Sequence, residues 1–366
     1  MLPRLQFGGP AAQEAFVAEG SRWVGETWVR LAHVEEDFVP LLESALQIAK
    51  ADFSSRILVT FDFPDLRDGV AGFDAKLWSP ESIRPVDSAL SERTRSFAIK
   101  NHGVEPNDDQ LLQSIANLRP IFDDDVLSKV VLAQRLRLDA PANWNGLKES
   151  SGPIWNLSLT EANRAFYGQS PEALLLWQNG RLETMALAGT TSRSDDPADD
   201  ARMATSLLES QKDRLEHQSV VTHLRQIFSA HCNWLCDSEP PQVIKLPQLQ
   251  HLCTHIHATD PDIHPLMVAA KLHPTPALCG TPRLEALHHL HQVEGFPRGL
   301  YGGVIGWFTP SSGSLVVGLR AIQQQDDVLE VIAGAGCVSG SDPHRELEEI
   351  QLKRDSILAE AGLYFA

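Results

Sequence analysis

Acidic and basic side chains in the C-terminal half of the chain recur at spacings that place them on single helix faces. Glu346, Glu349 and Lys353 are three and four residues apart, so they share one face of a helix expected over 343–361. Glu216 belongs to a second helical segment, QKDRLEH. Magnesium takes one or two protein carboxylates and completes its shell with water and substrate oxygens. If Glu216 and Glu349 converge, they can hold such an ion; the alternative is two solvated charged faces.

Two further titratable residues are candidates for proton transfer. Glu172 ends the loop sequence GQSPE. The nucleophile elbow of serine hydrolases has a second glycine at this position, so a serine hydrolase is excluded. A buried carboxyl group has a raised pKa and can donate a proton. Lys129 opens the apolar strand KVVLAQRLRL. It is either an edge lysine with a solvated ammonium or a desolvated base.

A glycine-rich strand end could bind an anion. Gly334 and Gly336 lie in the sequence AGAG, between a strand and a helix that begins with Ser341, Asp342 and Pro343. Residues without a Cβ let backbone amides approach a ligand closely, and such amides bind anions. The serine or aspartate cap and the proline support the helix start. A tight strand-to-helix turn without a ligand is the alternative.

One histidine-rich segment offers residues that could bind zinc. His251, Cys253, His255 and His257 alternate, so they share one face of an expected strand. Same-face neighbours on one strand rarely give four-coordinate geometry, and the remaining cysteines lack the spacing of zinc fingers. A partly polar strand face is therefore favoured.

Composition limits the class of partner. The chain has 366 residues and a net charge of −17, which argues against nucleic acid. An anionic substrate would require a local positive pocket in this acidic protein. No run approaches about 18 consecutive apolar residues, so no membrane span is expected. The five cysteines form no disulfide framework, which suits reduced thiols in a cytoplasm.

The hydrophobic periodicity predicts an α+β architecture with mostly antiparallel sheets, in one domain. Strands are expected over 129–138, 173–178, 181–188, 250–258, 302–308, 314–323 and 328–333. Helices are expected over 38–51, 108–118, 199–228, 265–271, 282–291 and 343–361.

Ten segments, in order, resemble the chorismate-utilising enzyme family. They are KVVLAQR (129–135), GQSPE (168–172), LAGT (187–190), QKDRLEH (211–217), HLCT (251–254), LHPTPALCGTPR (272–283), GLYGGVIGW (299–307), GLR (318–320), AGAG (333–336) and SDPHRELEEIQLK (341–353). The resemblance implies one large α/β domain with antiparallel sheets inside and helices outside. Residues 120–362 would be the catalytic core, and 1–119 a variable N-terminal part of the same domain.

The resemblance also implies a site for chorismate. Glu216 and Glu349 would bind the magnesium that holds the ring carboxylate, and Lys353 would add positive charge beside it. The remaining contacts would come from Tyr301, Arg320 and the amides of Gly334 and Gly336 to the enolpyruvyl carboxylate, and from Thr190 and His273 to the ring.

Two positions separate the branches of this family. Ammonia-using anthranilate synthases typically have glutamine where this chain has Lys129, and aminodeoxychorismate synthases have a lysine where it has Ala188. The resemblance therefore implies an isochorismate synthase, an isomerase that works as a monomer without a glutamine amidotransferase subunit. In that mechanism Lys129, with a depressed pKa, activates water to attack carbon 2, and Glu172 protonates the departing carbon-4 hydroxyl.

The pathway is indicated by two segments that differ in their resemblance. HPTPALCGTP is similar to isochorismate synthases that include siderophore-pathway enzymes, whereas GSDPHRELEEIQLK is closer to the menaquinone-pathway form. Menaquinone biosynthesis is expected. The alternatives are a siderophore-pathway isochorismate synthase or a salicylate synthase, which also eliminates pyruvate. A zinc-binding regulatory module is a rival from another class.

Overall fold

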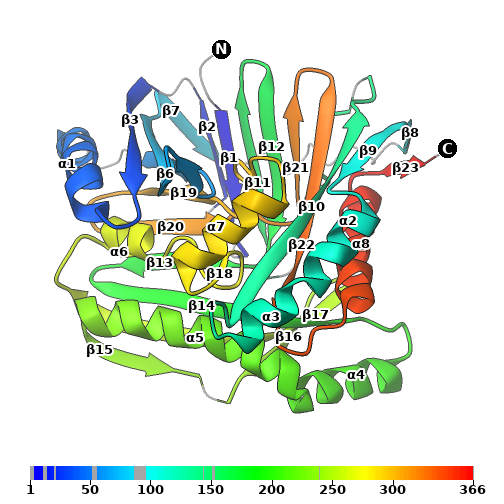
Figure 1. Ribbon diagram of the computed structural model, residues 1–366. Coiled ribbons are helices and arrows are strands. Elements are labelled where there is room, and N and C mark those ends of the chain that lie inside the picture. Colours follow the sequence, from blue (N-terminus) through cyan, green and yellow to red (C-terminus); the bar gives the residue numbers. More distant parts are fainter. Residues whose placement is uncertain are drawn as a thin grey trace.

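The fold is built on two large antiparallel sheets, seen in the computed structural model (Figure 1). The structure describes residues 4–10, 15–19, 22–51, 56–85, 96–142, 144–150, 153–238 and 240–365. The first sheet has the order β18-β10-β22-β21-β12-β11-β1-β2-β7, with β9 paired to β10. Its strands are β1 (Arg4–Gly8), β2 (Phe16–Glu19), β7 (Ser82–Pro85), β9 (Asn101–Glu105), β10 (Lys129–Asp139), β11 (Trp155–Glu161), β12 (Arg164–Ser170), β18 (Gly280–Thr281), β21 (Ala321–Gln325) and β22 (Val328–Val338).

The second sheet has the order β15-β17-β14-β13-β20-β19-β4-β6-β3, with β16 paired to β17 and β5 to β6. Its strands are β3 (Arg22–Arg30), β4 (Ile57–Phe61), β5 (Asp65–Arg67), β6 (Val70–Ser79), β13 (Ala173–Gln178), β14 (Arg181–Ser192), β15 (Cys232–Asp237), β16 (Gln242–Lys245), β17 (Leu249–Pro261), β19 (Val304–Phe308) and β20 (Ser312–Val317). A short parallel pair, β8 (Phe97–Ile99) and β23 (Leu363–Phe365), is separate from both.

Helices cover the outside of the two sheets (Figure 1). They are α1 (Val34–Ala51), α2 (Asp108–Ala116), α3 (Leu118–Asp123), α4 (Pro197–Glu209), α5 (Gln211–His231), α6 (Pro265–Leu272), α7 (Arg283–Val293) and α8 (Pro343–Glu360). Helix α5 packs on β14 and β17, and α8 packs on β22. Within the described ranges, no helix is both long and apolar enough to cross a membrane.

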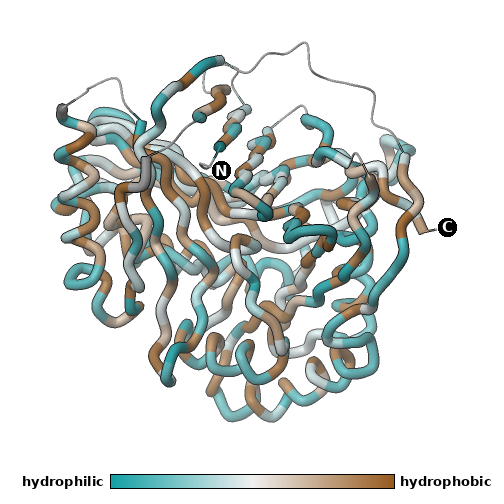
Figure 2. The backbone as a smooth tube through the Cα atoms, turned by 90° about the horizontal axis from the view of Figure 1, so that it is seen from above, coloured by the Kyte–Doolittle hydropathy of each residue, from teal (hydrophilic) through white to brown (hydrophobic). Residues whose placement is uncertain are grey.

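Apolar strand residues bring the sheets together. Phe7 and Trp155 from the first sheet join Leu58 and Trp307 from the second in one buried cluster. The tube of Figure 2 shows the same distribution, with hydrophobic strands inside and mostly hydrophilic turns of helix and loop outside. Burial of this surface is the main favourable term for the fold. The expected antiparallel α+β domain is confirmed.

Two long predicted elements are each divided in the structure. The helix expected over 199–228 is two helices, because Ser210 leaves the helical conformation (φ −63°, ψ 115°) and its Oγ caps α5 by accepting from the backbone N–H of Asp213 at 3.3 Å. The strand expected over 314–323 is also two, β20 in the second sheet and β21 in the first. The chain crosses between the sheets at Gly318 and Arg320, and Arg320 has a left-handed φ of 47°.

Candidate functional site

A cavity of about 110 Å³ lies where β14 and β17 of one sheet approach β10 and β22 of the other. A single water molecule needs roughly 10–15 Å³ by the same measure, so the space suits a small organic molecule. The predicted site residues that line it are Glu172, Thr190, Glu216, Tyr301, Arg320, Gly334, Gly336 and Lys353. Residues nearly 200 positions apart in sequence therefore share one cavity.

Glu216 and Glu349 are each paired with a lysine. Lys129 Nζ lies 3.1 Å from Glu216 Oε1, and Lys353 Nζ lies 2.6 Å from Glu349 Oε1. Lys353 also interacts electrostatically with Glu216. Glu216 on α5 and Glu349 on α8 therefore lie close enough for Lys353 to interact with both. Burial disfavours the charge of Lys353, but the Glu349 carboxylate outweighs it and raises the pKa of Lys353.

Gly336 lies against the side chains of Glu216 and Lys129. A Cβ at this position would lie 2.1 Å from Glu216 Oε1 and 3.1 Å from Lys129 Cε. A side chain at this position would displace the Glu216 carboxylate from where it lies.

The carboxylates fit a hard cation. Carboxylate oxygens are the ligands that magnesium prefers, and it commonly uses only one or two of them. Glu216 and Glu349 supply that number, and substrate and water oxygens would have to supply the rest. Across the described ranges, no group of three or more histidine, cysteine or acidic residues is arranged to hold a metal.

Lys129 is fully buried on β10, which pairs with β22 and β18. Its Nζ is within ion-pair distance of Glu216 but makes no hydrogen bond of good geometry with any described residue. The amine therefore has hydrogen-bonding capacity that the described residues do not use.

Glu172 lies between β12 and β13, and its side chain is buried against the cavity. Burial raises the pKa of Glu172 to about 8, although the positive charge of Lys129 acts in the opposite direction. A carboxyl group with this pKa keeps its proton at neutral pH and can act as an acid. The expectation of a buried, protonated Glu172 agrees with this environment.

The edge of β22 is open beside the cavity. Strand β21 pairs with β22 only as far as Val331, opposite Ile322, because the chain turns away at Arg320. Residues of β22 beyond this point have β10 as their one strand neighbour among the described residues. Backbone groups on the open side are therefore available to a ligand.

Gly334 and Gly336 point their amides toward that open side. Gly334 faces Ala133 of β10, but Ala133 N–H donates to Glu294 Oε1 at 2.8 Å and Gly334 O accepts from Lys353 Nζ at 2.9 Å. Gly334 and Ala133 therefore form a non-hydrogen-bonded pair of the antiparallel ladder, in which the backbone N–H and C=O groups point away from the partner strand. Because strand residues two apart have the same orientation, the Gly336 amide faces the same way.

Tyr301 and Arg320 complete this end of the cavity. Tyr301 Oη would lie 3.1 Å from a Cβ on Gly334, so the phenol stands over the glycine. Burial raises the pKa of Tyr301, which keeps its hydroxyl protonated as a donor. Arg320 Nη1 is buried and has no hydrogen-bond partner in the described part of the chain. Donors directed at one space suit a carboxylate.

Thr190 and His251 form the opposite wall, on β14 and β17. Thr190 Oγ1 and His251 Nδ1 are 3.1 Å apart, and both residues line the cavity. Burial lowers the pKa of His251 to about 3, so the imidazole is neutral. Sequence reasoning missed His251 as a site residue because it was weighed only as a zinc ligand. His255 and His257, on the same strand face, instead pair with Glu183.

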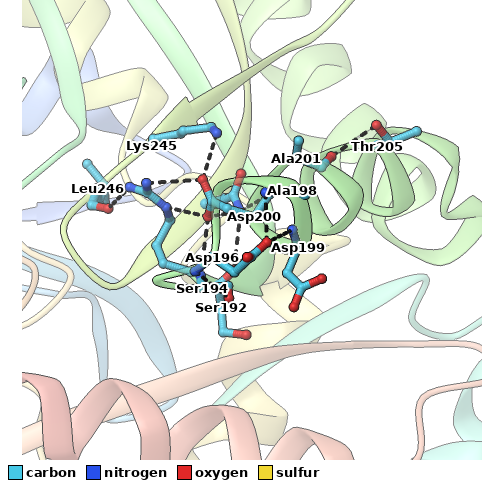
Figure 3. A network of polar contacts seen from close by, with 12 residues as sticks. Ser192, Ser194, Asp196, Ala198, Asp199, Asp200, Ala201, Thr205, Lys245 and Leu246 are labelled. Carbon is cyan, nitrogen blue, oxygen red and sulfur yellow. Dashed lines mark hydrogen bonds and ion pairs between the residues drawn. The ribbon is translucent and has the colours of Figure 1, made fainter.

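The buried carboxylate of Asp200 connects the segments at one end of this wall (Figure 3). Asp200 accepts hydrogen bonds from Arg193 Nε at 2.7 Å, Lys245 Nζ at 2.7 Å and Gln250 Nε2 at 2.9 Å. These donors come from the segment after β14, from β16 and from β17. Gln250 alternates with the cavity residues Leu249 and His251, so the network supports the wall from behind.

His273, predicted to line the ring pocket, is not among the residues that line this cavity. Its side chain is buried at the end of α6, where Nε2 donates to the backbone oxygen of Asp62 at 2.9 Å and the ring packs edge-on against Phe73. Arg283 Nη1 also donates to its carbonyl oxygen at 3.2 Å. These contacts hold the imidazole in the core near β4 and β6, away from the cavity.

Comparison with known proteins shows the family to which the chain belongs. Residues 52–361 match the family model described as chorismate binding enzyme. The chain belongs to this family. It is 35% identical to the vibriobactin-specific isochorismate synthase of Vibrio cholerae, over 91% of the chain and 88% of that protein. It is 31% identical to the isochorismate synthase DhbC of Bacillus subtilis, over 88% and 85%.

Solved structures of chorismate-binding enzymes have the same fold. DhbC from Bacillus anthracis superposes with a TM-score of 0.82 at 27% identity, covering 98% of this chain and 96% of that one. The menaquinone-specific isochorismate synthase MenF of Escherichia coli superposes with a TM-score of 0.77 at 22% identity, over 99% and 89%. The similarity to MenF, at 22% identity, shows a shared fold only.

Proposed function

We propose that the chain is an isochorismate synthase, which moves a hydroxyl group from carbon 4 to carbon 2 of the chorismate ring. The observation that carries the proposal is the buried, protonated Glu172 on a cavity that is also lined by Glu216, whose Oε1 lies 3.1 Å from Lys129 Nζ. Water adds at carbon 2, the ring double bonds shift, and the carbon-4 hydroxyl leaves as water. Substrate and product are therefore isomers.

Lys129 acts as the base and Glu172 as the acid. The amine of Lys129 takes a proton from the attacking water, since water is a poor nucleophile without a base. Glu172 gives its proton to the carbon-4 oxygen, so that water rather than hydroxide departs. Glu172 lines the cavity and the Lys129 amine lies beside Glu216 at its wall, so the two groups can act on one substrate.

The two carboxylates of chorismate are received at two ends of the cavity. Glu216 and Glu349 would hold magnesium, which would supply positive charge for the ring carboxylate. Arg320, Tyr301 and the glycine amides of β22 receive the enolpyruvyl carboxylate. This arrangement lets an acidic protein bind a dianion.

Water is the nucleophile rather than ammonia or a lysine. Ala188 lines the cavity, so this position offers no amine. No glutamine amidotransferase subunit is therefore required, and we infer a monomer acting in the cytoplasm.

The comparisons favour a siderophore pathway over the menaquinone pathway that the sequence of α8 suggested. The vibriobactin-specific enzyme is 35% identical over 91% of the chain, whereas MenF of Bacillus subtilis is 29% identical over 70%. We therefore infer that the isochorismate is consumed in making an aromatic siderophore precursor.

The direct test is incubation with chorismate and magnesium, followed by chromatography of the products. Isochorismate that disappears when EDTA is added supports the proposal. Salicylate with pyruvate would instead identify a salicylate synthase, and unchanged chorismate would contradict both.

A further inference from the structure

Helix α8 presents one polar face to the whole length of the site. Glu349, Lys353, Ser356 and Glu360 are separated by four, three and four residues, which places them along one stripe of the helix. Glu349 and Lys353 lie at the end with the carboxylates proposed to hold magnesium. Ser356 and Glu360 lie at the end where Arg320 enters the cavity.

The two residues at that end both bind the same nitrogen of Arg320. Arg320 Nη2 donates to Ser356 Oγ at 3.0 Å and to Glu360 Oε1 at 2.7 Å. Arg320 and Glu360 are only 11% and 18% exposed, so little solvent screens the pair. An Nη nitrogen carries two hydrogens, and both are therefore used on α8.

The Nη1 nitrogen of the guanidinium is left for a ligand. Arg320 lines the cavity, and its buried Nη1 has no hydrogen-bond partner within the described ranges. Because the guanidinium is planar, fixing Nη2 on α8 also fixes the direction of Nη1.

The backbone at Arg320 gives a second, independent sign of constraint. Its φ of 47° lies in the left-handed region, which is uncommon for a residue with a side chain. Such conformations persist only where the surroundings hold them, and they gather at functional sites. The backbone crossing between the sheets and the contact with α8 together set where this side chain points.

We propose that Glu360 is a positioning residue, which holds Arg320 so that Nη1 faces the enolpyruvyl carboxylate of the substrate. The inference rests on the proposed function and deepens it, because it assigns a role to a residue that does not touch the substrate. Glu360 acts through a hydrogen bond from Nη2, so an uncharged acceptor of the same length should serve as well.

The test compares Glu360→Ala with Glu360→Gln in the magnesium-loaded enzyme. The alanine variant should raise KM for chorismate about tenfold and leave kcat within about twofold of wild type. This pattern is expected when an interaction that binds the ground state and the transition state equally is lost. The glutamine variant, whose oxygen can still accept from Nη2, should restore KM to the wild-type value or below. Asp355→Asn, an exposed acid on the same helix, is the control and should change neither constant.

Three results would overturn this role. They are an unchanged KM in Glu360→Ala, a glutamine variant as impaired as the alanine variant, and a fall in kcat and melting temperature without a change in KM. Titration of chorismate into EDTA-treated wild type and variants by calorimetry separates this inference from the proposed function. A wild-type protein that binds chorismate but forms no isochorismate would contradict the function, while the affinities of the two variants would still decide the role of Glu360.

Discussion

Lys129 Nζ and Glu216 Oε1 are 3.1 Å apart, so the residue proposed as the base is paired with a carboxylate proposed to bind the metal. The pair lies over Gly336, which has no side chain to separate them. A cation bound by Glu216 would compete with Lys129 for the carboxylate. Metal binding and release of the amine toward water are thereby linked through one side chain.

Replacing Lys129 with alanine should abolish the activation of water. General-base catalysis typically contributes 10²–10⁴-fold, so kcat for isochorismate formation should fall by about that factor. Lys100→Ala, at an exposed position, is the control. Full activity in Lys129→Ala, measured by product chromatography, would exclude this residue as the base.

The acid role of Glu172 predicts a pH dependence. Its pKa is raised to about 8, so the protonated form is present below pH 8 and is lost as the pH rises through that value. The rate of isochorismate formation should therefore fall on the alkaline side. Glu172→Gln should reduce kcat by roughly 10²–10⁴-fold and remove this limb from the profile. An unchanged alkaline limb in the variant would assign it to another group.

Gly336→Ala should weaken metal binding. The added methyl would lie 2.1 Å from Glu216 Oε1, so the carboxylate must move. We expect the affinity for magnesium to fall by about 10–100-fold, as when groups that orient a metal ligand are lost. Isothermal titration with magnesium measures this change. The control is Gly8→Ala, where a Cβ would make only ordinary contacts at 3.8–3.9 Å; equal affinities in the two variants would contradict the assignment of Glu216.

Asp200→Asn should destabilise the wall formed by β14 and β17. The hydrogen bond from Arg193, followed by that from Lys245, lowers the pKa of Asp200, so its stabilising effect is present at neutral pH and is lost only as the pH falls below the ordinary range of an aspartate. The melting temperature should drop by several degrees relative to wild type between about pH 5 and 8, and the difference should shrink in stronger acid. Asp195→Asn, which is exposed, should melt like wild type. Identical melting of Asp200→Asn and wild type at pH 7 would show that the network adds nothing.

The parts of the site that could be predicted from sequence are those formed by residues close together in the chain. Glu349 and Lys353 share a helix face by their separation of four. The AGAG segment was predicted to follow a strand; it lies inside β22, where its glycine amides face the cavity. The separate resemblance to a family gave the pairing of Glu216 with Glu349, which no spacing within the chain reveals. The antiparallel α+β fold followed from the periodicity of the strands.

Other parts of the site depend on contacts that sequence does not encode locally. His273 was placed on the cavity, but its imidazole is held in the core by the backbone of Asp62. His251 and Glu360 were missed because each matters only through a partner from a distant segment, Thr190 and Arg320. The break between β20 and β21 was also missed, since an apolar run continues across the point where the chain changes sheets.

The origin of the new hydroxyl group tests the central claim most directly. Chorismate would be converted in water enriched in oxygen-18, and the isochorismate analysed by mass spectrometry and NMR. Attack by water activated at Lys129 predicts one oxygen-18 atom per product molecule, attached to carbon 2. Unlabelled isochorismate, formed by transfer of the carbon-4 hydroxyl within the substrate, would contradict the account.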